Sequence, residues 1–262
     1  MKAALLFSGK LGDWKECFES ISKNIIKPFN PDIFLTTWEG EDVDDFSRTF
    51  SPSALRLLNF EDCIKLLKVD KLTRKPSEGL IPMLAGIKGV HSLYREYEQE
   101  KSTSYDLVIR LRPDIQILES VNQQEIEDCI KSKCIRTPLF ESDNIYNHEE
   151  EMKKEFSFSF VYDKASLPNQ INDQFAIGHP NEMDKYMNCI SKVNEAIDKL
   201  WNEGYPEYMI KVPESVMTIC LQLQGCKYKQ LTGTNSFNNI KTILCKNGKK
   251  WRNRGHQSII AE

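Results

Sequence analysis

Hydrophobic and polar positions along the first 140 residues follow two periods, one typical of strands and one typical of helices. Apolar runs rich in leucine, β-branched and aromatic residues predict three strands, at 3–7, 32–38 and 54–60. Apolar residues that recur every three or four positions predict helices from Asp13 to Pro28, over 61–68 and from Pro82 onward. This alternation favours one mixed, mainly parallel sheet with helices on both faces.

The most informative stretch is 105–117, YDLVIRLRPDIQI, in which a hydrophobic strand ends on charged residues. Leucine, isoleucine and valine dominate its first half and predict a buried strand. Pro113 has no amide hydrogen and restricts Arg112 to extended geometry, so we expect the strand to end there. Asp114 would then lie at the carboxyl end of a central strand, the edge at which open α/β sheets bind ligands.

The second half of the chain is less regular. Its periodicity predicts a helix over 122–132, strands over 133–140 and 156–162, a strand within 171–178, a helix over 183–197, a helix from Pro213 to Gly225 and a strand around Tyr228. We interpret 69–79 as a surface loop and 141–155 as a variable insertion. No repeat or low-complexity linker divides the chain, which predicts a single α/β domain over residues 1–262.

Composition excludes several classes of protein. A formal net charge of −3 argues against a dedicated nucleic-acid-binding protein. The apolar run at 3–7 is too short for a signal peptide, and no later run approaches the roughly 18 apolar residues of a membrane span. The eight cysteines include no C-x-x-C pair, so we interpret them as reduced, mostly buried thiols and expect a cytoplasmic protein.

Charge is unevenly distributed along the chain. No acidic residue lies between Glu214 and Glu262, while lysine and arginine recur there. The basic tail, residues 233–262, either contacts an anionic partner such as a pyrophosphate or a membrane surface, or is a solvated chain end. Asp42-Val43-Asp44 forms a D-x-D in an acidic loop, and we interpret it as a solvated charge run rather than a metal motif.

Four motifs in a fixed order resemble a known family. They are ALLFSG in the first strand, DIFLTTW in the second, YREYEQE leading into YDLVIRLRPDI, and NDQFAIG. Together, from about residue 3 to about residue 223, they resemble small bacterial and viral glycosyltransferases of the GT-A type. The resemblance implies a GT-A-like, Rossmann-related fold that holds a nucleoside-diphosphate sugar with residues 1–120 and a glycan or lipid-linked glycan acceptor with residues 121–232.

The resemblance also implies roles for individual residues. The residues that would bind the donor are Ser8, Gly9, Lys10, Trp38, Arg112 and Asp114. GT-A enzymes commonly hold a divalent ion with a D-x-D after a central strand, but the equivalent place here reads Arg112-Pro113-Asp114. We therefore expect Asp114 to be the protein ligand of Mn²⁺ or Mg²⁺ and Arg112 to contact a phosphate. Trp38 either stacks on the base or belongs to the core.

Two carboxylates are candidates for the catalytic base of an inverting reaction. Asp173 is either a polar residue at a strand start or the group that deprotonates the acceptor hydroxyl. Glu214 either benefits from the dipole at a helix start or is a second candidate base. Arg110 either forms an ion pair, with Asp106 or a helix carboxylate, or contacts a phosphate.

The function that we expect is therefore glycosyl transfer from a nucleotide sugar to a hydroxyl of a glycan or glycolipid. The alternative is a non-catalytic glycan- or nucleotide-binding protein on the same fold, because the first carboxylate of the D-x-D is replaced by an arginine.

Overall fold

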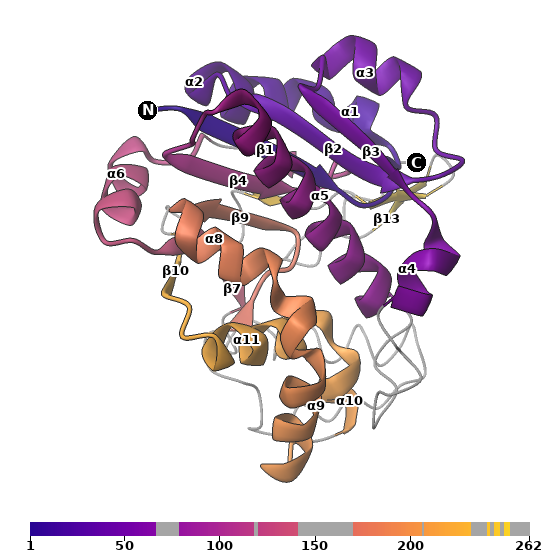
Figure 1. Cartoon of the computed structure of the whole chain (residues 1–262), viewed down its shortest axis with the longest axis vertical. Coiled ribbons are helices and arrows are strands. Elements are labelled where there is room, and N and C mark those ends of the chain that lie inside the picture. The colour runs from indigo at the N-terminus through magenta and orange to yellow at the C-terminus, as the bar shows by residue number, and fades with distance from the viewer. Residues whose placement is uncertain are drawn as a thin grey trace.

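The computed structural model describes residues 1–66, 79–117, 120–140, 170–205, 207–231, 240–241, 244–246 and 249–251. Within those residues, the centre of the fold is a seven-stranded sheet in the order β3-β2-β1-β4-β9-β6-β10 (Figure 1). Its strands are β1 (Ala3–Ser8), β2 (Asp32–Trp38), β3 (Ala54–Leu58), β4 (Leu107–Leu111), β6 (Ile135–Thr137), β9 (Phe175–Gly178) and β10 (Tyr228–Gln230).

The sheet is mixed but mainly parallel. Neighbours among β3, β2, β1 and β4 are parallel, and β10 is parallel to β6. β9 is antiparallel to both of its neighbours, β4 and β6. This arrangement confirms the predicted sheet and is consistent with a GT-A-like, Rossmann-related fold. The chain proceeds outward from β1 to β3 and then returns to place β4 on the other side of β1, so the carboxyl ends of β1 and β4 form a topological switch point.

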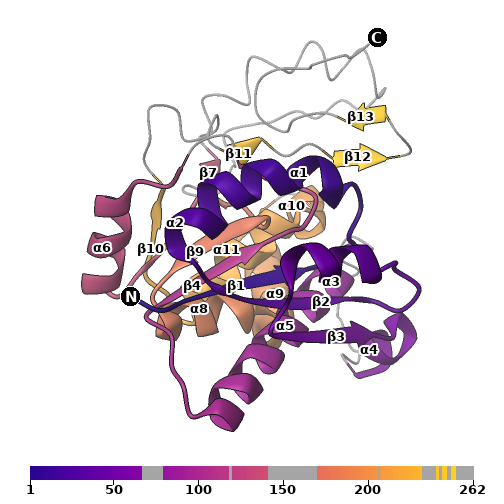
Figure 2. The ribbon, with the colours of Figure 1, turned by 90° about the horizontal axis from the view of Figure 1, so that it is seen from above.

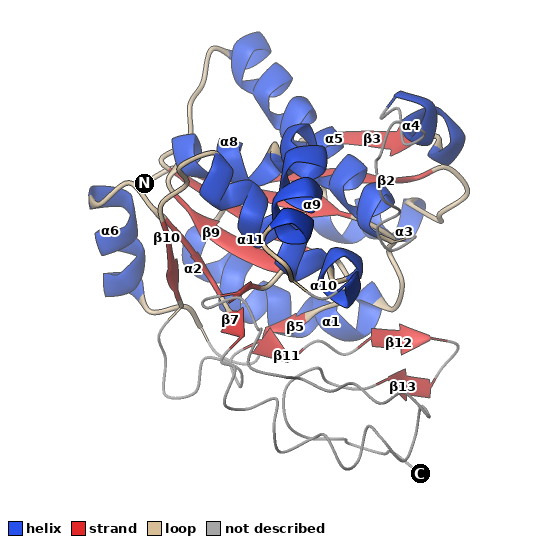
Figure 3. Cartoon of the chain, turned by 90° about the horizontal axis from the view of Figure 1, so that it is seen from below, coloured by secondary structure: helices blue, strands red, loops and turns tan. Residues whose placement is uncertain are grey.

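Helices cover both faces of the sheet because successive strand residues point to opposite sides. Leu5 and Phe7 pack in the core on one face and Ala4 and Leu6 in the core on the other. The first face carries α1 (Trp14–Ile21), α3 (Asp44–Phe50) and α6 (Gln123–Lys131), with the π-helical turn η1 (Ser22–Ile26) and α2 (Lys27–Phe29) between α1 and β2 (Figure 2). The second face carries α5 (Leu80–Lys101), α8 (Pro180–Met187), α9 (Val193–Asn202) and α11 (Pro213–Leu223) (Figure 3).

Several boundaries differ from the prediction. The helix predicted from Asp13 to Pro28 has no side-chain hydrogen bond at its N-cap Asp13, contains a π-helical turn and continues past Pro28. The single helix predicted over 183–197 is wrong: α8 ends at Met187, a 3₁₀ turn η5 (Cys189–Lys192) follows, and α9 begins at Val193. The Asn188 side chain donates to Ser191 Oγ at 3.0 Å, a local polar contact that competes with helix continuation.

Two short helices were not predicted from the sequence. α10 (Glu207–Lys211) precedes α11, and α3 follows the acidic loop. α3 buries Phe46 and Phe50 in an aromatic cluster, where the Phe46 ring lies 5.3 Å from Phe7 and 5.2 Å from Trp14. Tertiary packing of these rings, rather than local propensity, stabilises this helix.

Smaller elements complete the described part of the chain. They are α4 (Phe60–Leu66), β5 (Gln116–Ile117), β7 (Leu139–Phe140), β8 (Gln170–Ile171), β11 (Ile240–Lys241), β12 (Leu244–Lys246) and β13 (Lys249–Trp251). The predicted insertion at 141–155, the predicted strand at 156–162, residues 69–78 and most of the basic tail lie outside the described residues. Among the described helices, none is long and apolar enough to cross a membrane.

Candidate functional site

The site that the sequence predicts lies at the carboxyl ends of β1 and β4. Directly after β4, Arg112 and Asp114 bind each other: Arg112 Nε donates to Asp114 Oδ1 at 3.0 Å, and Nη2 donates to Oδ2 at 2.7 Å. Asp114 is 6% exposed. A bidentate guanidinium–carboxylate pair fixes both groups in one plane. The sequence assigned the two residues separate tasks, whereas in this structure each is the other's partner.

The turn after β1 packs against this pair. Gly12 has a φ of +52°, and a Cβ there would lie 3.2 Å from the Cβ of Asp114. Glycine is therefore required for two reasons, a left-handed backbone and close approach of the Asp114 side chain. The absence of a side chain at Gly12 therefore leaves room for the carboxylate of Asp114.

The antiparallel strand β9 brings the NDQ segment, residues 172–174, to the same edge. Leu111 pairs with Phe175, and the Arg112 amide donates to the Gln174 carbonyl at 3.1 Å. Asp173 is 6% exposed, and its Oδ1 accepts no hydrogen bond within the described residues. Asp173 thus precedes a strand and also lies at the carboxyl edge of the parallel strands, because β9 begins where those strands end.

Glu214 reaches this region from the first turn of α11. It is 3% exposed and follows Pro213, which occupies the first helical position. Thr218 links α11 to the residue before the NDQ segment. Its Oγ1 donates to the Glu214 carbonyl at 2.6 Å and accepts from the Ile171 amide at 3.1 Å. Glu214 therefore lies at a helix start and is buried, and its role as a base stays a prediction.

The charges of these residues interact. Burial of Arg112 works to lower its pKa, but the ion pair with Asp114 and the nearby carboxylates of Asp173 and Glu214 raise that pKa above the usual arginine value. We call Arg112, Asp114, Asp173 and Glu214 the edge cluster. It holds three carboxyl groups around one guanidinium.

The remaining predicted donor residues lie around this edge at different depths. Ser8 is buried, and its hydroxyl accepts from Arg110 Nε at 3.0 Å. The Gly9 amide donates to the Thr36 carbonyl at 3.2 Å, so the sheet already uses it. Lys10 is exposed. Trp38 ends β2, partly buried, with its ring centroid 5.7 Å from that of Phe60 in an edge-to-face contact.

One acidic residue at this edge was not singled out from the sequence. Glu41 Oε2 accepts from the Leu11 amide at 3.1 Å, which ties the acidic loop to the turn after β1. The neighbouring D-x-D serves a local purpose, because Asp42 Oδ1 accepts from the amide of Asp44, the first residue of α3, at 3.3 Å. Only the fold places these two loops in contact, so no sequence spacing indicated it.

The donor set limits how a divalent ion can bind. Both oxygens of Asp114 are bonded to Arg112, and within the described residues no group of three or more His, Cys, Asp or Glu side chains could hold a metal. An ion bound here would take Asp114 as its one protein carboxylate, would compete with Arg112 for it, and would complete its shell with phosphate oxygens and water, as Mg²⁺ often does. The prediction of Mn²⁺ or Mg²⁺ at Asp114 stays a prediction.

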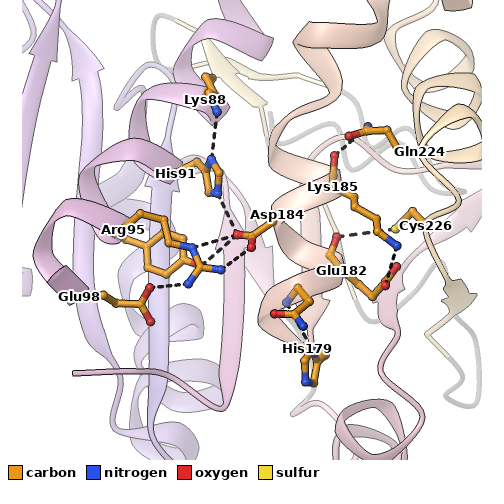
Figure 4. A network of polar contacts seen from close by, with 12 residues as sticks. Lys88, His91, Arg95, Glu98, His179, Glu182, Asp184, Lys185, Gln224 and Cys226 are labelled. Atoms are coloured by element: carbon orange, nitrogen blue, oxygen red, sulfur yellow. Dashed lines mark hydrogen bonds and ion pairs between the residues drawn. The ribbon is translucent and has the colours of Figure 1, made fainter. Parts of the chain in front are cut away.

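A second charged cluster lies on the second face of the sheet, between α5 and α8 (Figure 4). Asp184 Oδ1 accepts from His91 Nε2 at 2.9 Å, from Tyr94 Oη at 3.3 Å and from Arg95 Nε at 3.1 Å, and Oδ2 accepts from Arg95 Nη2. Arg95 Nη1 donates to Glu98 Oε2 at 2.6 Å. We call these five residues the α5–α8 network.

Other residues that could take part in metal or redox chemistry have structural roles. His179 caps α8, with its Nδ1 accepting from the Asn181 amide at 3.2 Å, and burial together with Lys133 lowers its pKa. The seven cysteines whose side chains the structure describes are all free thiols.

Comparisons with known proteins leave the family unassigned. No protein-family model and no curated protein sequence matches the chain. Among solved structures, the chain is similar to the apo form of mouse xyloside xylosyltransferase 1, with a TM-score of 0.46 and 9% sequence identity over 88% of this chain and 85% of that chain.

Proposed function

We propose that this protein is a glycosyltransferase that moves a sugar from a nucleoside-diphosphate sugar to a hydroxyl of a glycan or glycolipid acceptor. The observation that supports the proposal is the convergence of the edge cluster at the switch point between β1 and β4. Open α/β sheets bind their ligands at this place. Residues from both halves of the chain meet there, which suits a reaction with two substrates.

The catalytic base that we propose is Asp173. A buried carboxylate oxygen without a hydrogen-bond donor costs free energy on the order of 1–3 kcal/mol or more, so native proteins rarely retain one without a role. Asp173 Oδ1 is such an atom within the described residues. An acceptor hydroxyl would donate to it, and Asp173 would take that proton as the oxygen attacks the anomeric carbon. Glu214 is the second candidate for this role.

Arg112 is the residue that we propose for the leaving diphosphate. A guanidinium can bind phosphate oxygens bidentately and stabilise the charge that develops as the glycosidic bond breaks. Asp114 holds Arg112 in place through both of its oxygens. Ser8, Gly9 and Lys10 would contact the donor from the β1 side, and Trp38 would lie near its base.

Charge balance favours a divalent cation that arrives with the donor. Three carboxyl groups interact with Arg112, and Arg110 is the second guanidinium beside Asp173, so the carboxyl groups outnumber the guanidinium groups before a diphosphate adds further negative charge. Mn²⁺ or Mg²⁺ would neutralise phosphate charge when bound, with Asp114 as its protein ligand. Manganese electron paramagnetic resonance tests this: we expect little binding of Mn²⁺ to the protein alone, binding in the presence of UDP or GDP, and loss of that binding in Asp114→Asn.

A donor screen tests the function itself. We expect UDP-, GDP- or dTDP-sugars, with Mn²⁺ present, to raise the melting temperature, and one of them to be hydrolysed or transferred. Asp173→Asn should retain donor binding and lose turnover, while Asp106→Asn, an exposed carboxylate at the opposite end of β4, should keep both. The proposal is wrong if no donor and no nucleoside diphosphate stabilises the protein with or without Mn²⁺.

The alternative function is a glycan- or nucleotide-binding protein without catalysis. The ion pair between Arg112 and Asp114 favours this alternative. A carboxylate that accepts hydrogen bonds at both oxygens is a poor metal ligand until the arginine moves. Donor binding without any turnover, across the full panel and with acceptor glycans present, would select this alternative. Both functions are compatible with a lipid-linked glycan as partner.

A further inference from the structure

The largest fully buried side chain in the described part of the chain is that of Arg110, on β4. It is 1% exposed, and burial lowers its pKa, although Tyr186 and Asp173 counteract this effect. Placing a guanidinium in a protein interior costs several kcal/mol unless its donors are satisfied. No carboxylate of the described residues forms an ion pair with Arg110 within 4 Å, so neither of the ion pairs that the sequence suggested is present.

Arg110 instead binds neutral acceptors from two separate segments. Its Nε donates to the Ser8 hydroxyl at the end of β1, at 3.0 Å. Its Nη1 donates to the backbone carbonyl of Asp173. The Tyr186 hydroxyl, from α8, donates to the same carbonyl at 3.3 Å. Two donors therefore fix the main chain at Asp173, while Oδ1 of its carboxylate accepts no hydrogen bond within the described residues.

We propose that Arg110 is a positioning residue that holds the Asp173 backbone and the end of β1 in register, so that the base and the donor-binding turn face one reaction centre. This inference rests on the proposed function. Arg110 touches no substrate; it acts by fixing the two segments that do. A misplacement of about 1 Å at a reacting group can cost on the order of 10²-fold in rate. The hydrogen bonds of Arg110 to Ser8 and to the Asp173 carbonyl, which we call the Arg110 clamp, would prevent such a misplacement.

A purely structural role for Arg110 predicts a different result. In that case its replacement lowers the folded fraction, and turnover per folded molecule stays the same. A positioning residue lowers kcat in the folded protein by more than it raises the KM for the donor. The Asp173 backbone loses its bond to Arg110, whereas the turn after β1 keeps its backbone hydrogen bond from Gly9 to Thr36.

The test compares Arg110→Met, Arg110→Lys and Tyr186→Phe with wild type, using the full chain, the best donor of the screen and folded fractions from circular dichroism. We expect Arg110→Met to lower kcat about 10- to 100-fold with a donor KM within about threefold of wild type. Arg110→Lys keeps the charge but cannot reach both acceptors, so it should recover part of the rate. Tyr186→Phe removes the second donor to the Asp173 carbonyl and should lower kcat by less.

Glu182→Gln is the matched control. Glu182 is also a buried charged residue that fixes backbone, since its Oε2 accepts from the Lys227 amide at 2.7 Å, but it lies beside the start of β10, at the opposite edge of the sheet. Its replacement should lower stability and leave kcat within about twofold of wild type.

Two failures are distinguishable. If wild type turns over a donor and the Arg110 and Tyr186 variants keep wild-type kcat per folded molecule, or if Glu182→Gln loses as much kcat, the positioning role is wrong and the proposed function stands. If Arg110→Met does not fold, Arg110→Lys and Tyr186→Phe decide the question by the same kcat criterion. If wild type binds and converts no donor, the proposed function fails and the Arg110 role fails with it.

Discussion

The edge cluster and the α5–α8 network both combine carboxylates with an arginine, but they differ in how completely their hydrogen bonds are satisfied. Asp184 accepts hydrogen bonds at both oxygens, from His91, Tyr94 and Arg95. Asp173 is more deeply buried and has an oxygen that accepts none within the described residues. The network joins α5 of the first half to α8 of the second. The edge cluster joins the same two halves, but Oδ1 of its Asp173 accepts no hydrogen bond within the described residues.

Hydrogen-bond satisfaction therefore separates a structural charge cluster from a candidate site here. A satisfied network contributes to stability and specifies packing. A buried carboxylate that lacks a donor is costly, and a ligand hydroxyl can supply what is missing. Residue type does not separate the two clusters, since each combines acids with an arginine. Substitutions in the two clusters test this distinction.

The largest expected effect is on catalysis. Asp173→Asn should lower sugar transfer by about 10²- to 10⁴-fold, the range in which a positioned general base contributes, with little loss of melting temperature. Asp184→Asn should leave the rate per folded molecule within about twofold of wild type. Initial rates with one donor and circular dichroism on both variants check the prediction. Equal loss of rate in the two variants would remove the distinction between the clusters.

The next effect is on stability. Asp184→Ala leaves Arg95 without its main carboxylate, and we expect a loss of about 1–3 kcal/mol in the free energy of unfolding. This is less than for a fully buried pair, because the Asp184 side chain is 34% exposed. The melting temperature should fall by roughly 2–6 °C. Calorimetry measures it, and a loss below about 0.5 kcal/mol would show that the network contributes little.

A glycine substitution separates backbone strain from contact with the edge cluster. Gly12→Ala and Gly40→Ala both place alanine at positive φ, and we expect each to lose about 1 kcal/mol of stability. A Cβ at Gly40 meets nothing within 4 Å, whereas a Cβ at Gly12 contacts Asp114. Only Gly12→Ala should therefore weaken binding of UDP or GDP, measured by titration calorimetry. Equal affinities in the two variants would contradict a role for Asp114 in nucleotide binding.

The smallest effect is a pH dependence of the network. Burial works to raise the pKa of Asp184, but hydrogen bonds and charge from His91 and Arg95 leave that pKa below its usual value. A lowered folded-state pKa means that the stabilisation is complete above the unfolded-state value of about 3.9 and is lost as pH falls through the folded-state value. The difference in melting temperature between wild type and Asp184→Asn should shrink from pH 5 downward. A difference that grows in acid would show that the sign is wrong.

Much of the fold could be predicted from local pattern. The three N-terminal strands, β4 with its end before Pro113, and α11 from Pro213 all lie where periodicity and proline placed them. The predictions failed where packing overrides local preference. Phe46 and Phe50 form a helix because they pack on rings from β1 and α1, and no spacing in the sequence reveals those partners.

The same division holds for the site. Asp114, Asp173 and Glu214 were candidates because each lies beside a predicted strand end or helix start. The ion pair of Arg112 with Asp114 was not foreseen, although the two are neighbours in sequence, because strand alternation does not specify side-chain direction in the turn that follows. The clamp at Arg110 and the α5–α8 network depend on contacts between residues about 60 to 100 positions apart, which one sequence does not contain.

The stretch YDLVIRLRPDIQI determines its local structure by itself. Its apolar periodicity forms β4, Pro113 follows the end of the strand, and Asp114 lies at the strand's carboxyl end. What lies beside Asp114 depends on strand order and direction. β9 runs antiparallel, so the segment before it, with Asp173, lies at the edge where the parallel strands end. Strand direction arises from long-range pairing across more than 60 residues, and for that reason the edge cluster exists only in the folded chain.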